Sequence, residues 1–194
     1  MKKHVVAAFL ALAASSSMAA VITFDPLALN TAGLAAVSNY TEAGFSVSGP
    51  LGTIGAQFAG AYAGSASLFL ANPGNVATLA KVDGSTFSLN SIDLSALAPS
   101  WYGGGATVTF TGNVHGGGTL TQSFTTGTAL GFDTYTFSGF DMLDSVSWVQ
   151  AAPYYQFDNI VVDASAAVPE PGTLALFGVA LAGLGALRRK AFKA

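Results

Sequence analysis

The sequence predicts an all-β fold, an antiparallel two-sheet sandwich of jelly-roll type, over residues 20–167. Short runs rich in Val, Thr, Ser and Phe alternate apolar and polar residues, and each run ends at Gly, Pro, Asn or Asp. No stretch of this region keeps a convincing helical period over three turns. The chain contains no cysteine, so the packed core rather than disulfides must hold the fold.

About ten strands are expected from this alternation. They cover residues 21–24, 44–48, 67–71, 76–82, 86–94, 106–111, 119–124, 132–137, 145–149 and 156–163. A phase change predicts a bulge near Asn90-Ser91, and Asp83-Gly84 is the strongest hairpin signal in the chain. Residues 27–37 could hold one short helix. Trp148 alternates with Val146 and is therefore expected in the core.

Charge is distributed unevenly along the chain. Between Lys3 and Arg188 the only basic residue is Lys81, whereas nine of the ten acids lie in residues 20–167, so this region carries a net charge of −8. Nucleic-acid binding depends on Lys and Arg to displace counterions from phosphates. The charge balance therefore excludes nucleic acid as a partner and leaves neutral polymers and divalent cations.

The amino terminus has the organisation of a secretory signal peptide. A basic start with Lys2 and Lys3 precedes an apolar run over residues 5–14, and the small residues Ser17 and Ala19 occupy the positions expected before a cleavage site. The apolar run is too short to span a bilayer comfortably. We expect residues 1–19 to be a Sec signal, recognised by the Sec translocon and removed by signal peptidase.

The carboxy terminus has three parts in a fixed order. Val168-Pro169-Glu170-Pro171 comes first, an uncharged apolar run over residues 173–187 follows, and the basic cluster Arg188, Arg189 and Lys190 ends it. An apolar helix followed by basic residues is expected to enter a membrane with its basic end in the cytoplasm. At 1.5 Å per residue the run is ~22 Å long, shorter than a bilayer core of ~30 Å. The prolines keep the preceding segment extended, which suits access by a protease.

These three parts resemble the PEP-CTERM sorting signal of Gram-negative bacteria, and the resemblance covers residues 168–194. It implies export by Sec, transient retention in the inner membrane, and recognition by an exosortase that processes the chain near the Val168–Pro171 motif. Delivery to the cell surface or the extracellular matrix is implied as the outcome. The family is associated with exopolysaccharide and biofilm, and its ectodomains are commonly β-sandwiches. A permanent single-span anchor is the alternative.

Candidate catalytic groups are few. His115 is the only histidine after the signal peptide, and the chain has no Gly-x-Ser-x-Gly elbow, so a serine hydrolase is not indicated. A glycan-active enzyme would need two carboxylates, and the acids available for such a pair are Glu42, Asp141, Asp144 and Asp158. Asp141 and Asp144 have the placement of turn and strand-end residues. We therefore expect no enzymatic activity.

Calcium is the ion that best suits an acidic, cysteine-free domain, because it takes carboxylate and carbonyl oxygens. Asp25 follows the first expected strand, Glu42 precedes the second, and Asp158 lies in the last. The first and last strands of a sandwich are often neighbours, so these oxygens could meet around a structural calcium ion. No other cofactor is indicated. The alternative is that the acids shape the strand ends without an ion.

Aromatic residues in loops give the best candidates for ligand contact. Trp101 and Tyr102 lie in a loop between Pro99 and Gly105, and Tyr154 and Tyr155 follow a proline. Exposed aromatic rings stack on the C–H faces of sugars, whereas loop packing alone is the alternative role. We expect a surface or matrix protein whose sandwich contacts exopolysaccharide. The rivals are a secreted glycan-active enzyme and a purely structural matrix protein.

Overall fold

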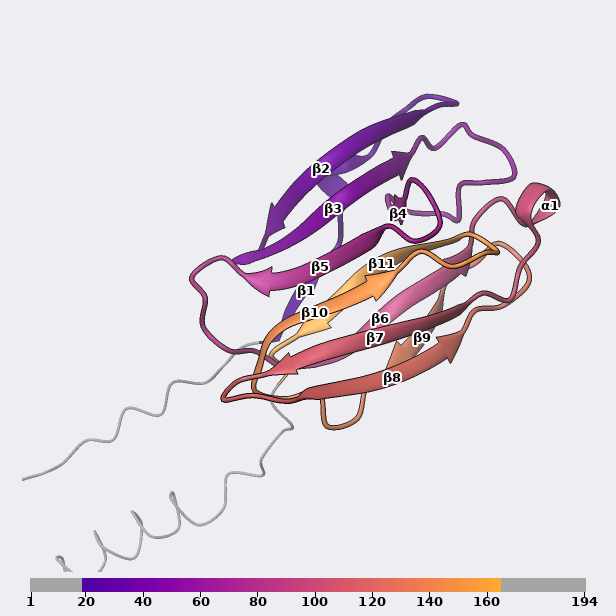
Figure 1. The fold of residues 1–194 in the computed structure, drawn as a ribbon. Coiled ribbons are helices and arrows are strands. Elements are labelled where there is room, and N and C mark those ends of the chain that lie inside the picture. Colours follow the sequence, from indigo (N-terminus) through magenta and orange to yellow (C-terminus); the bar gives the residue numbers. More distant parts are fainter. Residues whose placement is uncertain (1–18, 165–194) are drawn as a thin grey trace, which may run out of the picture. The chain divides into compact units, whose positions relative to one another are not determined.

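Eleven antiparallel strands build the part of the chain that the structure describes, residues 19–164 of a computed structural model (Figure 1). The strands are β1 (Ala20–Ile22), β2 (Leu34–Glu42), β3 (Phe45–Ile54), β4 (Leu68–Leu70), β5 (Val76–Lys81), β6 (Leu89–Ala96), β7 (Thr107–Val114), β8 (Thr119–Thr125), β9 (Asp133–Thr136), β10 (Leu143–Val149) and β11 (Tyr155–Val162). A 3-10 turn, η1 (Asp25–Leu27), and one short helix, α1 (Pro99–Tyr102), complete the described elements.

The strands pair in the order β8-β7-β10-β5-β3-β4-β11-β6-β9, with β2 beside β3 and β1 beside β11. In Figure 1, β2, β3, β5, β10, β7 and β8 run side by side, and β1, β11, β6 and β9 lie behind them. β4 pairs with both β3 and β11 and so joins the two layers. The predicted all-β antiparallel sandwich is confirmed, and so is the pairing of the first strand with the last.

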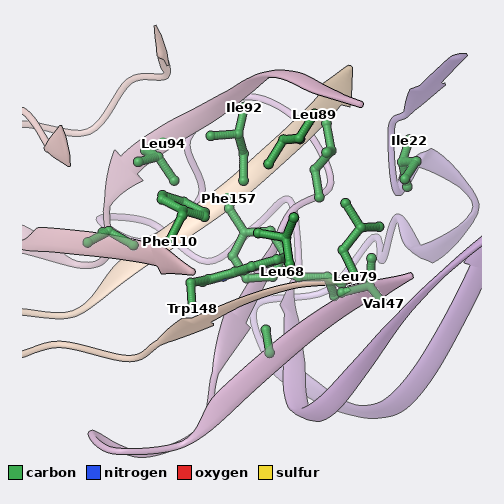
Figure 2. Packing of buried hydrophobic residues seen from close by; sticks show 14 of the residues in the cluster. Ile22, Val47, Leu68, Leu79, Leu89, Ile92, Leu94, Phe110, Trp148 and Phe157 are labelled. Atoms are coloured by element: carbon green, nitrogen blue, oxygen red, sulfur yellow. The ribbon is translucent and has the colours of Figure 1, made fainter. Parts of the chain in front are cut away.

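Inward-facing residues of both layers meet in one core (Figure 2). Phe110 of β7, Trp148 of β10 and Phe157 of β11 are almost completely buried. The Trp148 ring packs edge-on against Phe157, with ring centroids 5.0 Å apart, and lies 5.4 Å from Phe110. Trp148 and Val146 are buried together, as their alternation predicts. Aromatic contacts of this kind add to the stabilisation that burial itself provides.

The outward face of β7 and β8 carries the alternating hydroxyl residues. Thr107 pairs with Thr125 and Thr109 with Ser123, at oxygen–oxygen distances of 3.1 and 2.8 Å. These side chains are exposed, whereas Val108 and Phe110 between them are buried. The alternation seen in the sequence is therefore that of strands with one dry and one wet face.

The prediction of a short helix over residues 27–37 is wrong. Leu34 and Val37 belong to β2 and pair with Ile54 and Leu51 of β3. The long-range pairing satisfies the backbone groups that a helix would have satisfied locally. The bulge near Asn90 is confirmed, since Val161 pairs with Ser91 whereas its neighbour Val162 pairs with Leu89.

Asp83-Gly84 does not close a hairpin. β5 pairs with β3 and β10, whereas β6 pairs with β11 and β9, so the turn carries the chain from one layer to the other. Gly84 has φ +74°, and the Ser85 amide donates to Asp83 Oδ1 at 2.9 Å. This bond and the Ser85 hydroxyl hold the pKa of Asp83 below its usual value. The dipeptide therefore predicts the turn but not the partner of the strand that precedes it.

Within residues 19–164, no helix is long and apolar enough to cross a membrane. The predicted signal peptide, apart from Ala19, and the sorting signal with its apolar run lie outside the described residues.

Candidate ligand-binding site

A pocket of about 150 Å³ opens at the end of the sandwich that carries α1. Figure 1 shows α1 at the end toward which β3 and β10 run. The wall is formed by the start of β2, the loop between β3 and β4, the end of β4, the segment from β6 into α1, and the loop between β10 and β11. Its lining residues are Leu34, Phe58, Ala61, Phe69, Ala71, Leu97, Ala98, Trp101, Tyr102 and Tyr154.

The single turn of α1 places two aromatic residues on this rim. Pro99 at the first turn has the backbone angle that a helix start requires. The amides of Trp101 and Tyr102 donate to the Ala98 carbonyl at 2.8 and 3.1 Å, and Gly103 ends the turn with φ +76°. The side chains of Trp101 and Tyr102 stay 58% and 51% exposed. The turn is thus held by backbone bonds while its two rings remain accessible.

Each exposed ring rests against a second aromatic residue. Trp101 and Phe58 have ring centroids 5.5 Å apart at an interplanar angle of 50°, and Tyr102 and Tyr154 lie 4.7 Å apart at 41°. Both separations lie in the range of favourable aromatic pairs. The two pairs bring together rings from α1, the β3–β4 loop and the β10–β11 loop, and they orient the rim before any ligand is present.

The floor of the pocket is hydrocarbon. Ala61, Leu97, Ala98 and Phe69 are buried and, with Ile54, form a second apolar cluster separate from the main core. The far end of the Phe69 ring lies so close to Gly52 of β3 that a Cβ added there would come within 2.6 Å of it. The absence of a side chain at Gly52 therefore shapes one wall.

Gln156 ties the walls together from beneath. This fully buried side chain donates from Nε2 to the Ala61 carbonyl at 2.9 Å and to the Ala96 carbonyl at 3.0 Å. Its Oε1 accepts from the Ser67 hydroxyl at 2.7 Å. One residue of β11 thus fixes the β3–β4 loop against the end of β6, where the segment that leads into α1 begins.

Three of the four predicted glycan contacts gather in this pocket: Trp101, Tyr102 and Tyr154. The prediction for Tyr155 is wrong, because its side chain is fully buried and its hydroxyl donates to the Val149 carbonyl at 2.8 Å. Burial also raises the pKa of the Tyr155 phenol. Tyr155 is the first residue of β11, whose first four side chains are all buried, whereas Tyr154 belongs to the preceding loop. The sequence did not point to Phe58 and Phe69.

The side chain of Glu42 is engaged in hydrogen bonds within the protein. Its carboxylate accepts from the amides of Thr23 and Phe24 at 2.8 and 3.2 Å, and from the hydroxyls of Thr23 and Tyr40 at 3.1 Å each. Burial and the neighbouring Glu42 raise the pKa of Tyr40 to about 12. Glu42 therefore fastens the chain that leaves β1 to the end of β2.

Asp158 lies in the interior, where its Oδ1 accepts from the Asn159 amide at 2.7 Å and its Oδ2 from the Ser65 hydroxyl. Desolvation raises its pKa to about 6, partly offset by these bonds, and the charges of Asp93 and Asp25 contribute to the rise. Within residues 19–164, no group of three or more His, Asp or Glu side chains could hold a metal ion. The acids predicted to share calcium, Asp25, Glu42 and Asp158, do not form such a group.

The remaining candidate carboxylates and the single histidine lie elsewhere. Asp144 Oδ1 is 2.9 Å from His115 Nδ1, and both side chains are largely exposed. Asp141 is exposed as well. None of the residues that line the pocket carries a carboxylate.

Beyond the domain, residues 167–190 match the PEP-CTERM protein-sorting motif. The chain is a PEP-CTERM sorting-motif protein. The match contains the predicted motif Val168–Pro171 and ends at Lys190, the last residue of the predicted basic cluster. A PEP-CTERM motif indicates export and exosortase-dependent sorting to the surface. The matched segment lies outside the described residues.

No curated protein matches the chain. Among solved structures, a variant of a family 29 carbohydrate-binding module is 15% identical, with 76% of this chain and 91% of that chain covered and a TM-score of 0.39. TmCBM61 in complex with β-1,4-galactotriose is 13% identical, with 65% and 98% covered and a TM-score of 0.38. At these values the likenesses do not indicate a shared ligand.

Proposed function

We propose that this PEP-CTERM protein is a non-enzymatic surface or matrix protein whose sandwich domain binds exopolysaccharide in the pocket beside α1. The observation that carries the proposal is the exposed pair Trp101 and Tyr102 on the rim of an apolar pocket. Small-molecule sites are concave and mostly apolar, and exposed aromatic residues are enriched where binding energy concentrates. Aromatic faces suit pyranose rings because both surfaces are apolar while their edges remain solvated.

Strand connectivity supports a jelly-roll assignment for this domain. From β4 to β11 the chain moves between the two layers, giving the order β5-β10-β7-β8 in one and β4-β11-β6-β9 in the other. We infer that β2 and β3 form a hairpin added beside β5. The added hairpin supplies Leu34, and the chain that leaves it supplies Phe58, so it builds one side of the pocket.

Replacing Trp101 with alanine is expected to weaken glycan binding at least about tenfold, since truncating an aromatic residue on which binding energy concentrates typically costs ~2 kcal/mol or more. Affinity for a panel of neutral polysaccharides (β-glucan, galactan, mannan and an acetylated heteropolysaccharide) would be measured with the full-length chain in detergent. Trp101→Phe, which keeps a ring, is the matched control and should retain most of the affinity. Unchanged binding by Trp101→Ala would contradict the proposal.

The same panel separates the rival functions. Release of shorter products, abolished by Glu42→Gln in a variant that keeps the unfolding midpoint of the wild type, would instead establish the glycan-active enzyme with a carboxylate pair. Absence of binding to every polysaccharide would favour the purely structural matrix protein. The pocket favours binding without turnover because its lining holds no carboxylate.

For sorting, we propose entry through the Sec translocon, removal of residues 1–19 by signal peptidase, transient residence in the inner membrane of a Gram-negative cell, and exosortase cleavage near Val168–Pro171. Mass spectrometry of the surface protein should find a carboxy terminus near this motif and no Arg188, Arg189 or Lys190. A Glu170→Ala variant should accumulate uncleaved in the membrane fraction. An intact tail on the surface protein would exclude the processing step.

A further inference from the structure

The chemistry of the pocket narrows the glycan that it can take, an inference that rests on the proposed function. Its buried floor offers no polar side chain, since Ala61, Leu97, Ala98 and Phe69 are all hydrocarbon. The polar side-chain atoms of the lining belong to Trp101, Tyr102 and Tyr154, which stand at the rim in the two aromatic pairs.

Four backbone groups of the floor are already engaged within the protein. The Ala61 amide donates to the Phe58 carbonyl at 3.2 Å, and the Ala61 carbonyl accepts from Gln156. The Leu97 amide donates to the Tyr154 carbonyl at 3.0 Å. The Ala98 carbonyl accepts from the amides of Trp101 and Tyr102. A sugar hydroxyl pushed into the floor would therefore lose its bonds to water without replacement, which is costly.

The charge of the domain further restricts which sugars can bind in the pocket. Across the described part of the chain the only Lys or Arg is Lys81, and its Nζ lies 2.7 Å from Asp163 Oδ2. No lining residue of the pocket is charged. Anionic sugars such as uronic acids find no cation here and would also meet the negative charge of the domain. The ligand is therefore neutral.

We propose that this pocket takes a methyl group carried by a neutral glycan, the C6 methyl of a 6-deoxyhexose or the methyl of an O-acetyl ester. The sugar ring stacks on Trp101 or Tyr102 at the rim, where its hydroxyls stay in water, and the methyl enters the hydrocarbon floor. A volume of about 150 Å³ is smaller than the roughly 300 Å³ at which pockets begin to enclose a drug-sized ligand, so the pocket has room for an apolar substituent but not for a whole oligosaccharide.

Matched ligand pairs test this with the full-length chain. L-Fucose against L-galactose, and L-rhamnose against L-mannose, differ only in the C6 hydroxyl. A naturally acetylated polysaccharide is compared with the same polymer after alkaline deacetylation. Binding is read by calorimetry and by the fluorescence of the exposed Trp101, with the buried Trp148 as an unresponsive background. The methyl-bearing member of at least one arm should bind about tenfold tighter.

A preference in the sugar arm alone identifies a 6-deoxyhexose, and one in the polymer arm alone identifies an acetyl ester. Equal binding of both members in every pair, or tighter binding of the hydroxylated member, overturns the methyl inference while the proposed glycan function stands. Absence of binding in every arm overturns the methyl inference, and it overturns the proposed glycan function as well if the neutral polysaccharides of the panel also fail to bind. Ala61→Ser adds a hydroxyl to the floor and should reduce the preference, whereas Thr121→Ala on the outer face of β8 should leave it unchanged.

Discussion

Replacing Gln156 with leucine is expected to lower the free energy of unfolding by about 2–4 kcal/mol and to abolish ligand binding. The leucine side chain fills a similar volume but removes three buried hydrogen bonds. The Ser67 hydroxyl and the Ala61 carbonyl then lose this partner in the interior, and each such loss costs ~1–3 kcal/mol. Because Ala61 belongs to the pocket floor, the β3–β4 loop should also move away from the end of β6.

Chemical denaturation and glycan affinity, measured on the same preparations, check this expectation. Gln122→Leu is the matched control, because the Gln122 side chain in β8 also donates to a carbonyl, that of Thr136, and accepts from the Ser138 amide, but both bonds are exposed. It should lose no more than ~1 kcal/mol and keep its affinity. If both variants lose the same stability, the buried network does not hold the pocket.

Strands could be predicted where the signal is local. The alternation in residues 106–111 marks β7 because every second side chain meets the core, and Trp148 follows the same rule in β10. The two failures concern partners. Whether residues 34–37 form a helix or a strand depends on β3, and whether Asp83-Gly84 closes a hairpin depends on β10 lying beside β5. β10 lies far from β5 in sequence, and although β3 directly follows β2, it pairs Leu34 with Ile54, 20 positions later.

The residues of the pocket likewise divide into those that a local sequence signal predicts and those that depend on contacts with distant parts of the chain. A proline followed by Trp101-Tyr102 and three glycines predicts exposed rings, because such a segment cannot continue a strand. Phe58 carries no comparable signal, since its role depends on Trp101, which lies 43 positions later in the chain and whose ring centroid comes within 5.5 Å only in the folded domain. The burial of Tyr155 could not be predicted from the proline that precedes the tyrosine pair. A proline-linked tyrosine pair predicts a loop end, but the side chain that begins β11 turns inward.

The stability of the domain is expected to fall as pH rises from about 4 to about 7, with Asp158 as the cause. Burial raises the pKa of this carboxyl from 3.8 to about 6 in the folded protein. Below the unfolded value both states hold the proton, so its contribution is constant. Between the two values only the folded state binds the proton, so each rise in pH costs stability. Above about 7 the penalty of the buried charge is complete.

A shift of this size corresponds to up to about 3 kcal/mol, because one pKa unit is worth ~1.4 kcal/mol. Thermal and urea unfolding at pH 4.5, 6 and 7.5 would be compared for the wild-type chain and the Asp158→Asn variant, which cannot titrate at this position. The variant should lose much less stability over the range, whereas Asp144→Asn at the exposed partner of His115 should retain the wild-type slope. Parallel slopes for wild type and Asp158→Asn would show that the buried carboxyl does not control this pH dependence. The expected direction follows from the burial of Asp158, which disfavours its charged form, and the charge of Asp93, its partner in β6, adds to the rise in pKa.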